Sequence, residues 1–201
     1  IKYLKNNKNR GLIYTLNRGL SIAQCKYIAR MDADDICMST RLEKQVAYLD
    51  SHPEVIICGA QIEYFGTKSN KYVKLSFPTK DKILKEMLAF STCFAHPTVM
   101  MRKDIIVKNK LQYDYDYKNA EDYCMWINMI SLGKFANLDE ALVKYRISDA
   151  QVSQPYNLQT IKSVMACRRK YLERYLSEDE IKDLFESPIK VWTVKSIKQK
   201  I

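Results

Sequence analysis

The chain alternates short apolar runs with segments in which apolar residues recur every three to four positions. Apolar runs at 26–31, 54–65 and 140–146 predict buried strands, and the helical spacing predicts helices at 11–24 and 39–52. Because strands and helices alternate along the chain, the pattern predicts an α/β fold, in which a sheet is flanked by helices on both faces.

Weaker patterns complete the prediction. Further strands are expected at 1–4, 72–77 and 96–102, with helices at 82–90 and 119–132. Two polar residues at helix starts, Ser39 and Asn119, are expected to act as N-caps.

The pattern changes after Pro155 and becomes helical. Residues 157–176 are expected to form one long helix, and "SEDE" at 177–180 has the spacing of a capping box that starts another. We therefore expect a helical C-terminal extension.

Composition adds limits to this picture. With 201 residues, 47% of them hydrophobic, the chain is long enough for one substantial core. No apolar run approaches the length of a membrane span, and the basic start lacks the apolar region of a signal peptide. The six cysteines stand singly, which predicts a reduced, cytosolic protein.

The formal net charge of +10 favours an anionic partner. Nucleic acid, acidic lipid and a phosphorylated small molecule all fit that charge, as does a merely solubilising surface. No nucleic-acid-binding motif can be identified.

Against this positive background, three aspartates follow the predicted strand at 26–31 in the sequence "RMDADD". In an extended chain Asp32 and Asp34 project to the same side, about 7 Å apart, with Asp35 beside them. Carboxylates at a strand end suit Mg²⁺ or Mn²⁺ bound together with substrate phosphates. Like charges so close repel one another, so we expect a positive partner among them.

Other interpretations of this cluster are possible. A calcium-binding EF-hand fails, because Ile36 and Cys37 occupy the positions that need an oxygen ligand and a glycine. A phosphatase could use Asp32 as nucleophile and Asp34 as acid, although Asp35 then departs from the usual motif. An acidic loop that caps the next helix is the structural alternative.

A second acidic pair, Glu121 and Asp122, opens the predicted helix at 119–132. Acidic residues in a first turn complement the helix dipole, and alternatively one carboxylate serves as a general base. Nearby, Trp126 fits either the core or an acceptor platform. His96 beside Pro97, and an arginine at 146, are weaker candidates for a binding cleft.

Taken in order, these stretches resemble the bacterial family 2 glycosyltransferases, which are inverting enzymes with a GT-A fold. The resemblance implies a mixed sheet flanked by helices. The correspondence covers residues 1–153 and consists of Asn9 and Gly11, "TLNRGL" with Asn17, "KYIARMDADD", "HPTVMMRK", "AEDYCMWINMI" and "YRISDAQVS". We accordingly divide the chain into a partial catalytic domain, 1–153, and a helical extension, 154–201.

The resemblance implies a metal-dependent sugar transfer. Asp32, Asp34 and Asp35 would hold Mn²⁺ or Mg²⁺ on the diphosphate of a nucleotide-sugar, a UDP-sugar in our expectation. Asp122 would be the base that deprotonates the acceptor hydroxyl, supported by Glu121. The other residues that the resemblance brings into the site are Asn17 and Arg146 on the donor side and His96 and Trp126 on the acceptor side.

The resemblance also sets the expected partners. The acceptor would be a saccharide or a lipid-linked saccharide in surface polysaccharide or lipopolysaccharide synthesis, at the cytoplasmic side of the membrane and without nucleic acid. The segment 187–201 contains four lysines and Trp192, and it could contact the membrane surface or pack on the domain as a helix.

Two departures from the family pattern affect these expectations. Ser148 stands where the family often has histidine. The family also usually begins with two further strand–helix units that hold the nucleobase and ribose, and this chain corresponds to the family from the third strand onward. We therefore expect the 201-residue chain alone to bind donor poorly and to have little activity.

Overall fold

The computed structural model describes residues 3–66, 76–147 and 158–186. Its centre is one five-stranded sheet with the strand order β1-β4-β3-β5-β2. The strands are β1 (Tyr27–Ala29), β2 (Ile36–Cys37), β3 (Val55–Phe65), β4 (Met100–Arg102) and β5 (Lys134–Arg146).

The sheet is mixed, as the sequence predicts. The two long central strands, β3 and β5, run parallel, while β1, β4 and β2 pair antiparallel to their neighbours. A parallel pair needs a crossover, and the chain between β3 and β5 supplies it with several short helices and β4. This crossover brings the end of β5 beside β2, and therefore beside the loop that follows β1.

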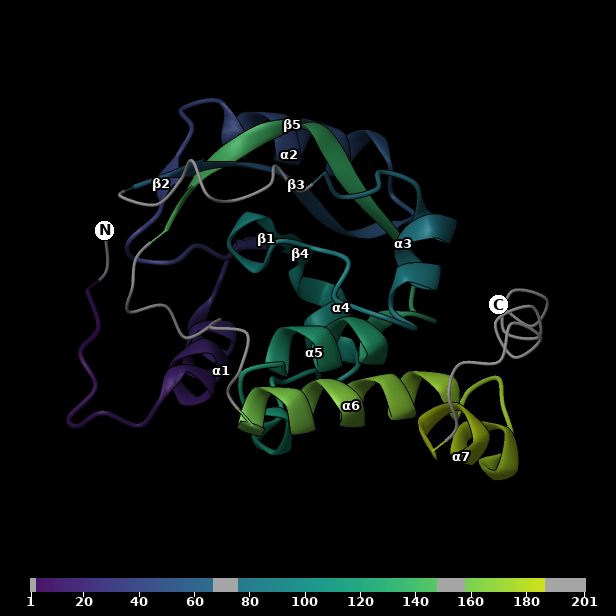
Figure 1. Cartoon of the computed structure of the whole chain (residues 1–201). Helices are drawn as coiled ribbons and strands as arrows, with labels where there is room; N and C mark the ends of the chain where they lie inside the picture. The colour runs from purple at the N-terminus through teal and green to yellow at the C-terminus, as the bar shows by residue number, and fades with distance from the viewer. Residues whose placement is uncertain (1–2, 67–75, 148–157, 187–201) are drawn as a thin grey trace.

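Helices cover both faces of the sheet (Figure 1). α2 lies on one face, and α5 and α6 lie in successive layers below the other. The helices are α1 (Leu12–Ile22), α2 (Arg41–Ser51), α3 (Asp81–Met87), α4 (Lys103–Lys108), α5 (Glu121–Met129), α6 (Leu158–Leu172) and α7 (Glu178–Glu186), with 3₁₀ turns η2 (His96–Thr98) and η3 (Tyr115–Tyr117).

Alternation along the strands divides the core between these two layers. Ile57 and Met101, which are paired across β3 and β4, belong to the large core that contains α5 and α6. Cys58 and Met100, the next pair, belong to the smaller core under α2 with Leu49. Since successive side chains of a strand point to opposite faces, each helix layer packs against its own set of strand residues.

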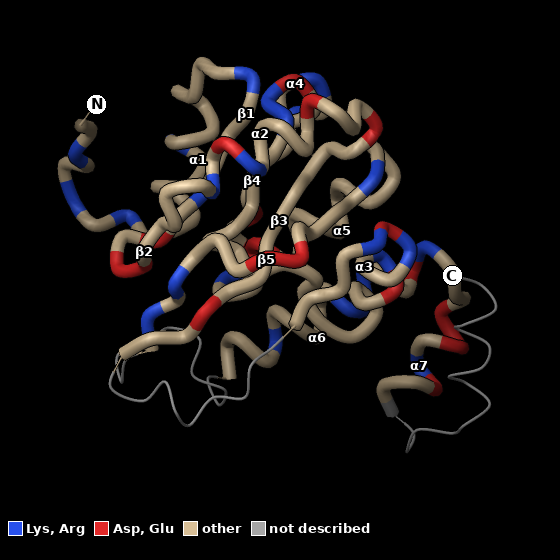
Figure 2. Tube along the Cα trace, turned by 90° about the horizontal axis from the view of Figure 1, so that it is seen from above, with Lys and Arg blue, Asp and Glu red and all other residues tan. Residues whose placement is uncertain are grey.

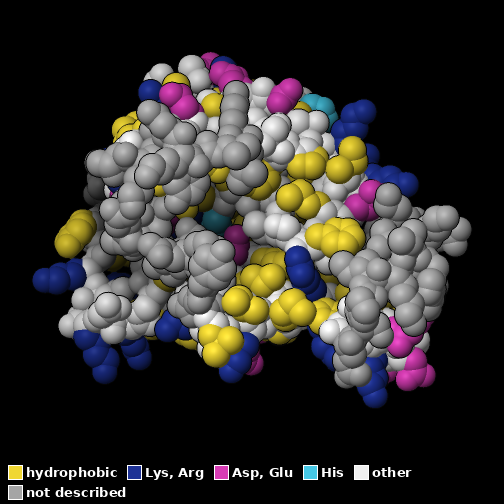
Figure 3. All heavy atoms as spheres, viewed as in Figure 1, with side chains coloured by type: hydrophobic (Ala, Val, Ile, Leu, Met, Phe, Trp, Pro, Cys, Tyr) yellow, Lys and Arg dark blue, Asp and Glu magenta, His cyan; other side chains and the backbone are white. Residues whose placement is uncertain are grey.

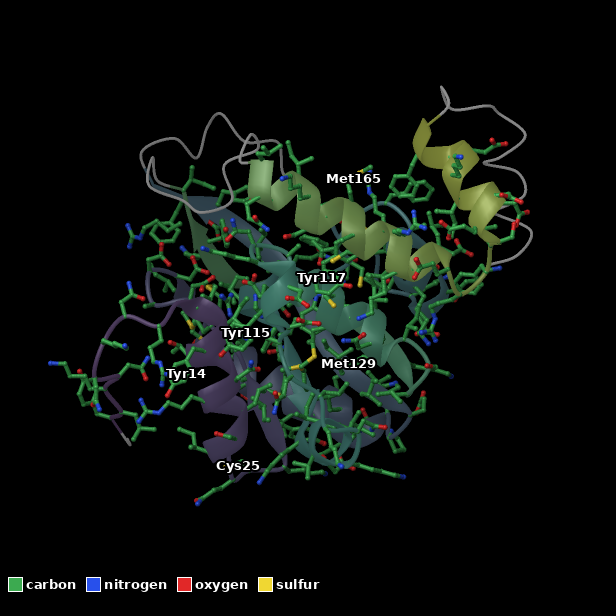
Figure 4. The ribbon with its side chains drawn as sticks, turned by 90° about the horizontal axis from the view of Figure 1, so that it is seen from below. Tyr14, Cys25, Tyr115, Tyr117, Met129 and Met165 are labelled. Atoms are coloured by element: carbon green, nitrogen blue, oxygen red, sulfur yellow. The ribbon has the colours of Figure 1, made fainter. Side chains whose placement is uncertain are left out.

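The C-terminal helices are part of the same core. Cys167, Tyr171 and Ile181 are fully buried in the cluster that also holds α5. α6 also passes close to η3, where Lys170 lies over the ring of Tyr117 at 5.1 Å (Figure 4). In the described part of the chain, no helix has the length and apolar character to cross a membrane.

Several boundary predictions are confirmed and others are wrong. The capping box before α7 forms as predicted, because Ser177 and Glu180 bond each other's backbone N–H groups. Residues 3–4 are not a strand, and neither predicted cap is one: Thr40 and Ala120 precede α2 and α5 without side-chain capping bonds. The amide of Asn119 instead bonds the hydroxyl of Thr160.

Some expectations fall on residues that the structure leaves undescribed. These are most of the strand at 72–77, the boundary at 153/154, Ser148 and the segment 187–201.

A buried polar network holds α2 against the sheet. Arg41 is 1% exposed, and its guanidinium donates to the carbonyl of Arg30 at 2.7 Å and to Gln45 at 3.0 Å. Gln45 in turn donates to the carbonyls of Cys58 and Thr98. These carbonyls lie in three separate segments, just after β1, within β3 and in η2, so the network fixes the chain at the point where β1 ends.

We predict that Arg41→Met destabilises the fold by about 1–3 kcal/mol, because it leaves buried carbonyl oxygens without donors. Urea unfolding would measure the loss. Lys44→Met on the same helix is the matched control, since Lys44 only pairs with Glu140 at the surface, and it should cost less than about 1 kcal/mol. Equal stability of the two variants would contradict a structural role for the buried network.

Candidate active site

The loop between β1 and β2 carries the acidic cluster to the end of β5, and acidic positions gather beside β2 in Figure 2. The backbone N–H of Arg146 donates to Asp35 Oδ1 at 2.9 Å, and its Nε donates to the carbonyl of Asp34 at 2.8 Å. The structure thus brings Arg146 and the aspartates together. Contact of Arg146 with a donor phosphate stays a prediction.

Arg30 supplies the positive charge that the cluster requires. Its guanidinium binds both carboxylate oxygens of Asp32, through Nη1 to Oδ2 at 2.7 Å and through Nη2 to Oδ1. The Arg30 side chain is 9% exposed and that of Asp32 is 33% exposed. A bidentate pair at this depth is stronger than an exposed ion pair, because less water screens it.

Asp34 and Asp35 lie in different surroundings. Burial raises the pKa of Asp35, with the N–H of Arg146 acting in the opposite direction and the charges of Asp32 and Asp34 adding to the rise. Asp35 Oδ2 is buried and has no hydrogen-bond partner among the described residues. The carboxylate of Asp34 is exposed, and no described side chain donates to it.

These residues fit a hard divalent cation through few protein ligands. Across the described ranges, no three acidic, histidine or cysteine side chains converge into a metal-binding group, so the predicted set of three aspartates is not preassembled. Mg²⁺ and Mn²⁺ commonly use one or two carboxylates and complete their shell with phosphate oxygens and water. Asp34 is open for such a ligand, whereas Asp32 is engaged by Arg30.

The second acidic pair lies at the start of α5. Glu121 is buried, and Asp122 is half-buried in the next position. Burial, followed by the charge of Glu121, raises the pKa of Asp122 to about 6, and the positive charge of Arg30 acts against that rise. Arg30 therefore lies within electrostatic range of Asp122 while it contacts Asp32, and it links the two acidic motifs.

His96 completes the floor of the site through a chain of contacts. Its Nε2 lies 3.0 Å from the hydroxyl of Tyr113, and burial together with Arg30 holds the pKa of His96 well below its usual value. The backbone of Tyr113 is in turn held at both polar groups by the amide of Asn17, at 2.8 Å each. Asn17 therefore acts on the site through Tyr113 and His96, and its direct contact with a donor stays a prediction.

Trp126 is a core residue. It is 0% exposed and packs edge-to-face against Phe94 and His96, with ring centroids 5.5 and 5.8 Å away. An acceptor platform needs an accessible ring face, so the structure favours the core alternative and leaves Trp126 as a support for His96. Figure 3 shows the hollow above this floor, with a histidine and an acidic side chain at its bottom.

Sequence reasoning missed two members of this arrangement. Arg30 stands two positions before Asp32, and the unbalanced negative charge of "DADD" could have indicated it. Tyr113 carried no signal in the sequence, because its role depends on a contact with His96 that forms only in the folded chain.

The mixed sheet, its helical layers and the acidic loop at a strand end define a glycosyltransferase-like α/β domain. The family model described as "Glycosyl transferase family 2" matches residues 1–109. The chain belongs to this family.

Relatives support that assignment. The chain is 35% identical to the amylovoran biosynthesis glycosyltransferase AmsE of Erwinia amylovora, over 78% of the chain and 58% of AmsE. It is 34% identical to the O-antigen biosynthesis glycosyltransferase WbnJ of Escherichia coli, over 90% of the chain and 72% of WbnJ. The chain thus spans little more than half the length of AmsE.

The fold comparison agrees. The structure of TarS from S. aureus, residues 1–349 in complex with UDP-GlcNAc, superposes with a TM-score of 0.61 over 92% of this chain and 58% of TarS, at 16% identity. At that identity the likeness concerns the GT-A-like fold alone, and it confirms the predicted fold class.

We predict that Asp122→Asn stabilises the folded chain at pH 8. Because the folded pKa is raised to about 6 from 3.8, the folded state favours the protonated acid, and that contribution is lost as pH rises through about 6. The asparagine cannot ionise, so the variant should exceed wild type by about 1–2 kcal/mol at pH 8 and converge with it towards pH 4. Urea unfolding at both pH values measures this, and a variant that is less stable at pH 8 would refute the buried-acid interpretation.

Proposed function

We propose that this chain carries the catalytic part of an inverting glycosyltransferase, which moves a sugar from a nucleotide-diphosphate donor to a saccharide acceptor. The observation that carries the proposal is the meeting of two acidic motifs across Arg30. Arg30 binds Asp32, in a loop suited to a cation and a diphosphate, and its charge also acts on Asp122, an acid whose pKa is raised to about 6. The family provides the reaction class in which both motifs have a use.

Asp122 is the proposed base. Its carboxylate would accept the proton of the acceptor hydroxyl while that oxygen attacks the anomeric carbon, and the bond from that carbon to the diphosphate oxygen breaks on the opposite side. A raised pKa brings a carboxylate closer to the proton affinity that this transfer needs. The charge of Glu121 adds to the rise in the pKa of Asp122 that burial causes. His96, neutral and held by Tyr113, would orient the acceptor.

The acidic loop is the proposed leaving-group side. Asp34 would hold Mn²⁺ or Mg²⁺, with Asp32 and Asp35 close by, and the cation would neutralise the charge that develops on the departing diphosphate. Arg146, which bonds Asp35 and the carbonyl of Asp34, would bind a phosphate of the donor, and its position beside the aspartates supports this role. Asp32, held by both oxygens to Arg30, is poorly suited to be the nucleophile of a phosphatase.

The relatives suggest the biological setting. AmsE and WbnJ are named for amylovoran and O-antigen biosynthesis, and WfaP of Escherichia coli, 26% identical, is named for glucose transfer from UDP-glucose to a diphosphoundecaprenol-linked sugar. We propose the corresponding class here, a UDP-sugar donor and a saccharide or lipid-linked acceptor in surface polysaccharide synthesis. Peripheral contact of the basic segment 187–201 with a membrane belongs to the same proposal.

Cooperative stabilisation by Mn²⁺ and UDP tests the donor site. We predict that thermal stability rises only when both ligands are present, and that Asp34→Asn abolishes this rise because it removes the open carboxylate. Asp104→Asn, an exposed aspartate on α4, is the matched control and should respond like wild type. A metal-independent, salt-sensitive shift with an oligonucleotide, or phosphate release from a phosphomonoester, would instead support a nucleic-acid-binding or phosphatase function.

A further inference from the structure

Arg30 has a place in the site that the proposed function does not by itself explain. Resting on that proposed function, we propose that Arg30 is a resident counter-ion of the donor site, which makes binding of the divalent cation depend on the diphosphate that accompanies it. Arg30 is thus a positioning residue, because it acts through Asp32.

The contacts of Arg30 show that it occupies the place a cation would take. Both oxygens of Asp32 are engaged by the guanidinium, one of them at 2.7 Å. A divalent cation that used Asp32 would compete for these same oxygens, and it would be repelled by the guanidinium charge a few ångströms away. A cation arriving alone must therefore either avoid Asp32 or displace Arg30.

Displacement without a replacement partner is unfavourable. The Arg30 side chain is 9% exposed, and its Nε has no hydrogen-bond partner among the described residues. A guanidinium that lost Asp32 in such a place would keep a largely desolvated charge with no direct partner. Arg30 therefore protects Asp32 from free cations.

A diphosphate changes that balance. Phosphate oxygens match the fork of a guanidinium as well as a carboxylate does, so a donor that enters with its cation offers Arg30 a new partner at the moment Asp32 is released. The cation and the diphosphate then each favour binding of the other, which is a coupling free energy between two ligands.

The backbone of Arg30 is held on both sides by hydrogen bonds, so only its side chain can move from Asp32 to a phosphate. The Arg30 N–H donates to the carbonyl of Val99 at 3.0 Å, and its own carbonyl accepts from Arg41 at 2.7 Å. Because both backbone groups are bound, the exchange needs a change of side-chain rotamers and no movement of β1. It also changes the charge near Asp122, which lies within range of the same guanidinium.

The test measures Mn²⁺ affinity with and without UDP, by calorimetry and by the electron paramagnetic resonance of free Mn²⁺. In wild type we expect UDP to tighten Mn²⁺ binding. Arg30→Gln removes the competing charge, so we predict that it tightens binding of Mn²⁺ alone about tenfold and reduces the enhancement by UDP by a similar factor. Arg30→Lys keeps the charge without the fork and should lie between the two.

A matched control is available at the start of the same strand. Lys26 forms an exposed ion pair with Asp50, and Lys26→Gln should leave both Mn²⁺ affinities unchanged. If Arg30 had a merely structural role, Arg30→Gln would weaken the binding of Mn²⁺ alone, because a disordered Asp32 would bind Mn²⁺ more weakly. Should Arg30→Gln fail to fold, Arg30→Lys is the deciding variant: tighter binding of Mn²⁺ alone than in wild type supports the proposal, and weaker or equal binding refutes it.

The outcomes separate this inference from the proposed function. If wild type responds to Mn²⁺ with UDP and Asp34→Asn does not, but Arg30→Gln binds Mn²⁺ alone no more tightly than wild type, the role of Arg30 is refuted and the donor site stands. Because the chain is expected to bind donor weakly, the ligands are raised to concentrations that fill a weak site. If wild type then shows no response to the two ligands together, the metal site of the proposed function fails, and the role of Arg30 fails with it.

Discussion

The buried guanidinium of Arg41 is the contact on which the arrangement of this domain depends. Through Arg41 and Gln45, helix α2 supplies donors to carbonyls of Arg30, just after β1, of Cys58 in β3 and of Thr98, just before β4. Apolar packing alone would hold α2 against the sheet without fixing its position along the strands, because hydrophobic contact has little directionality. The hydrogen bonds are directional, so they fix the position of α2 along the strands.

This constraint reaches the site because one of the bound carbonyls belongs to Arg30. The same residue donates its N–H to Val99, so the backbone is fixed at the last point before the acidic loop. The loop then begins from a rigid position and ends at β2, which is paired with β5. The short loop between these anchors keeps the three aspartates close together, and a nearby positive group, Arg30, balances part of their charge.

The sequence predicted the elements well where periodicity was strong and poorly where backbone geometry decided. The strand at 54–65 and the helix at 39–52 were found within two residues, because their apolar positions recur over a long stretch. Ser39 and Asn119 were wrong as caps: Asn119 adopts a positive φ of 67° and bonds Thr160, a residue that is distant in sequence. Capping rules use only neighbouring residues, so they cannot predict a contact between residues so distant in sequence.

The site shows the same division. Asp32, Asp34 and Asp122 could be singled out as carboxylates at element ends, and the family resemblance gave them a common purpose. Other features of the site arise only in the folded chain. Trp126 is enclosed in the core and His96 contacts Tyr113 because segments distant in sequence pack together. Asp32 is paired with Arg30 through a choice of side-chain conformation between residues two positions apart. The sequence alone does not specify these choices.

The link between the two acidic motifs through Arg30 follows from topology. The acidic loop leaves the edge strand β1, whereas Asp122 starts a helix that lies in the crossover between the parallel strands β3 and β5. Helix α5 packs against the face of the sheet opposite α2, through Trp126 and its neighbours (Figure 1). Arg30 binds Asp32 in the loop, and its positive charge also acts on Asp122, so one cationic side chain serves both motifs. Arg30, whose carbonyl is bound by Arg41 and whose guanidinium is paired with Asp32, thus combines a fixed backbone with the positive charge that acts on both acidic motifs.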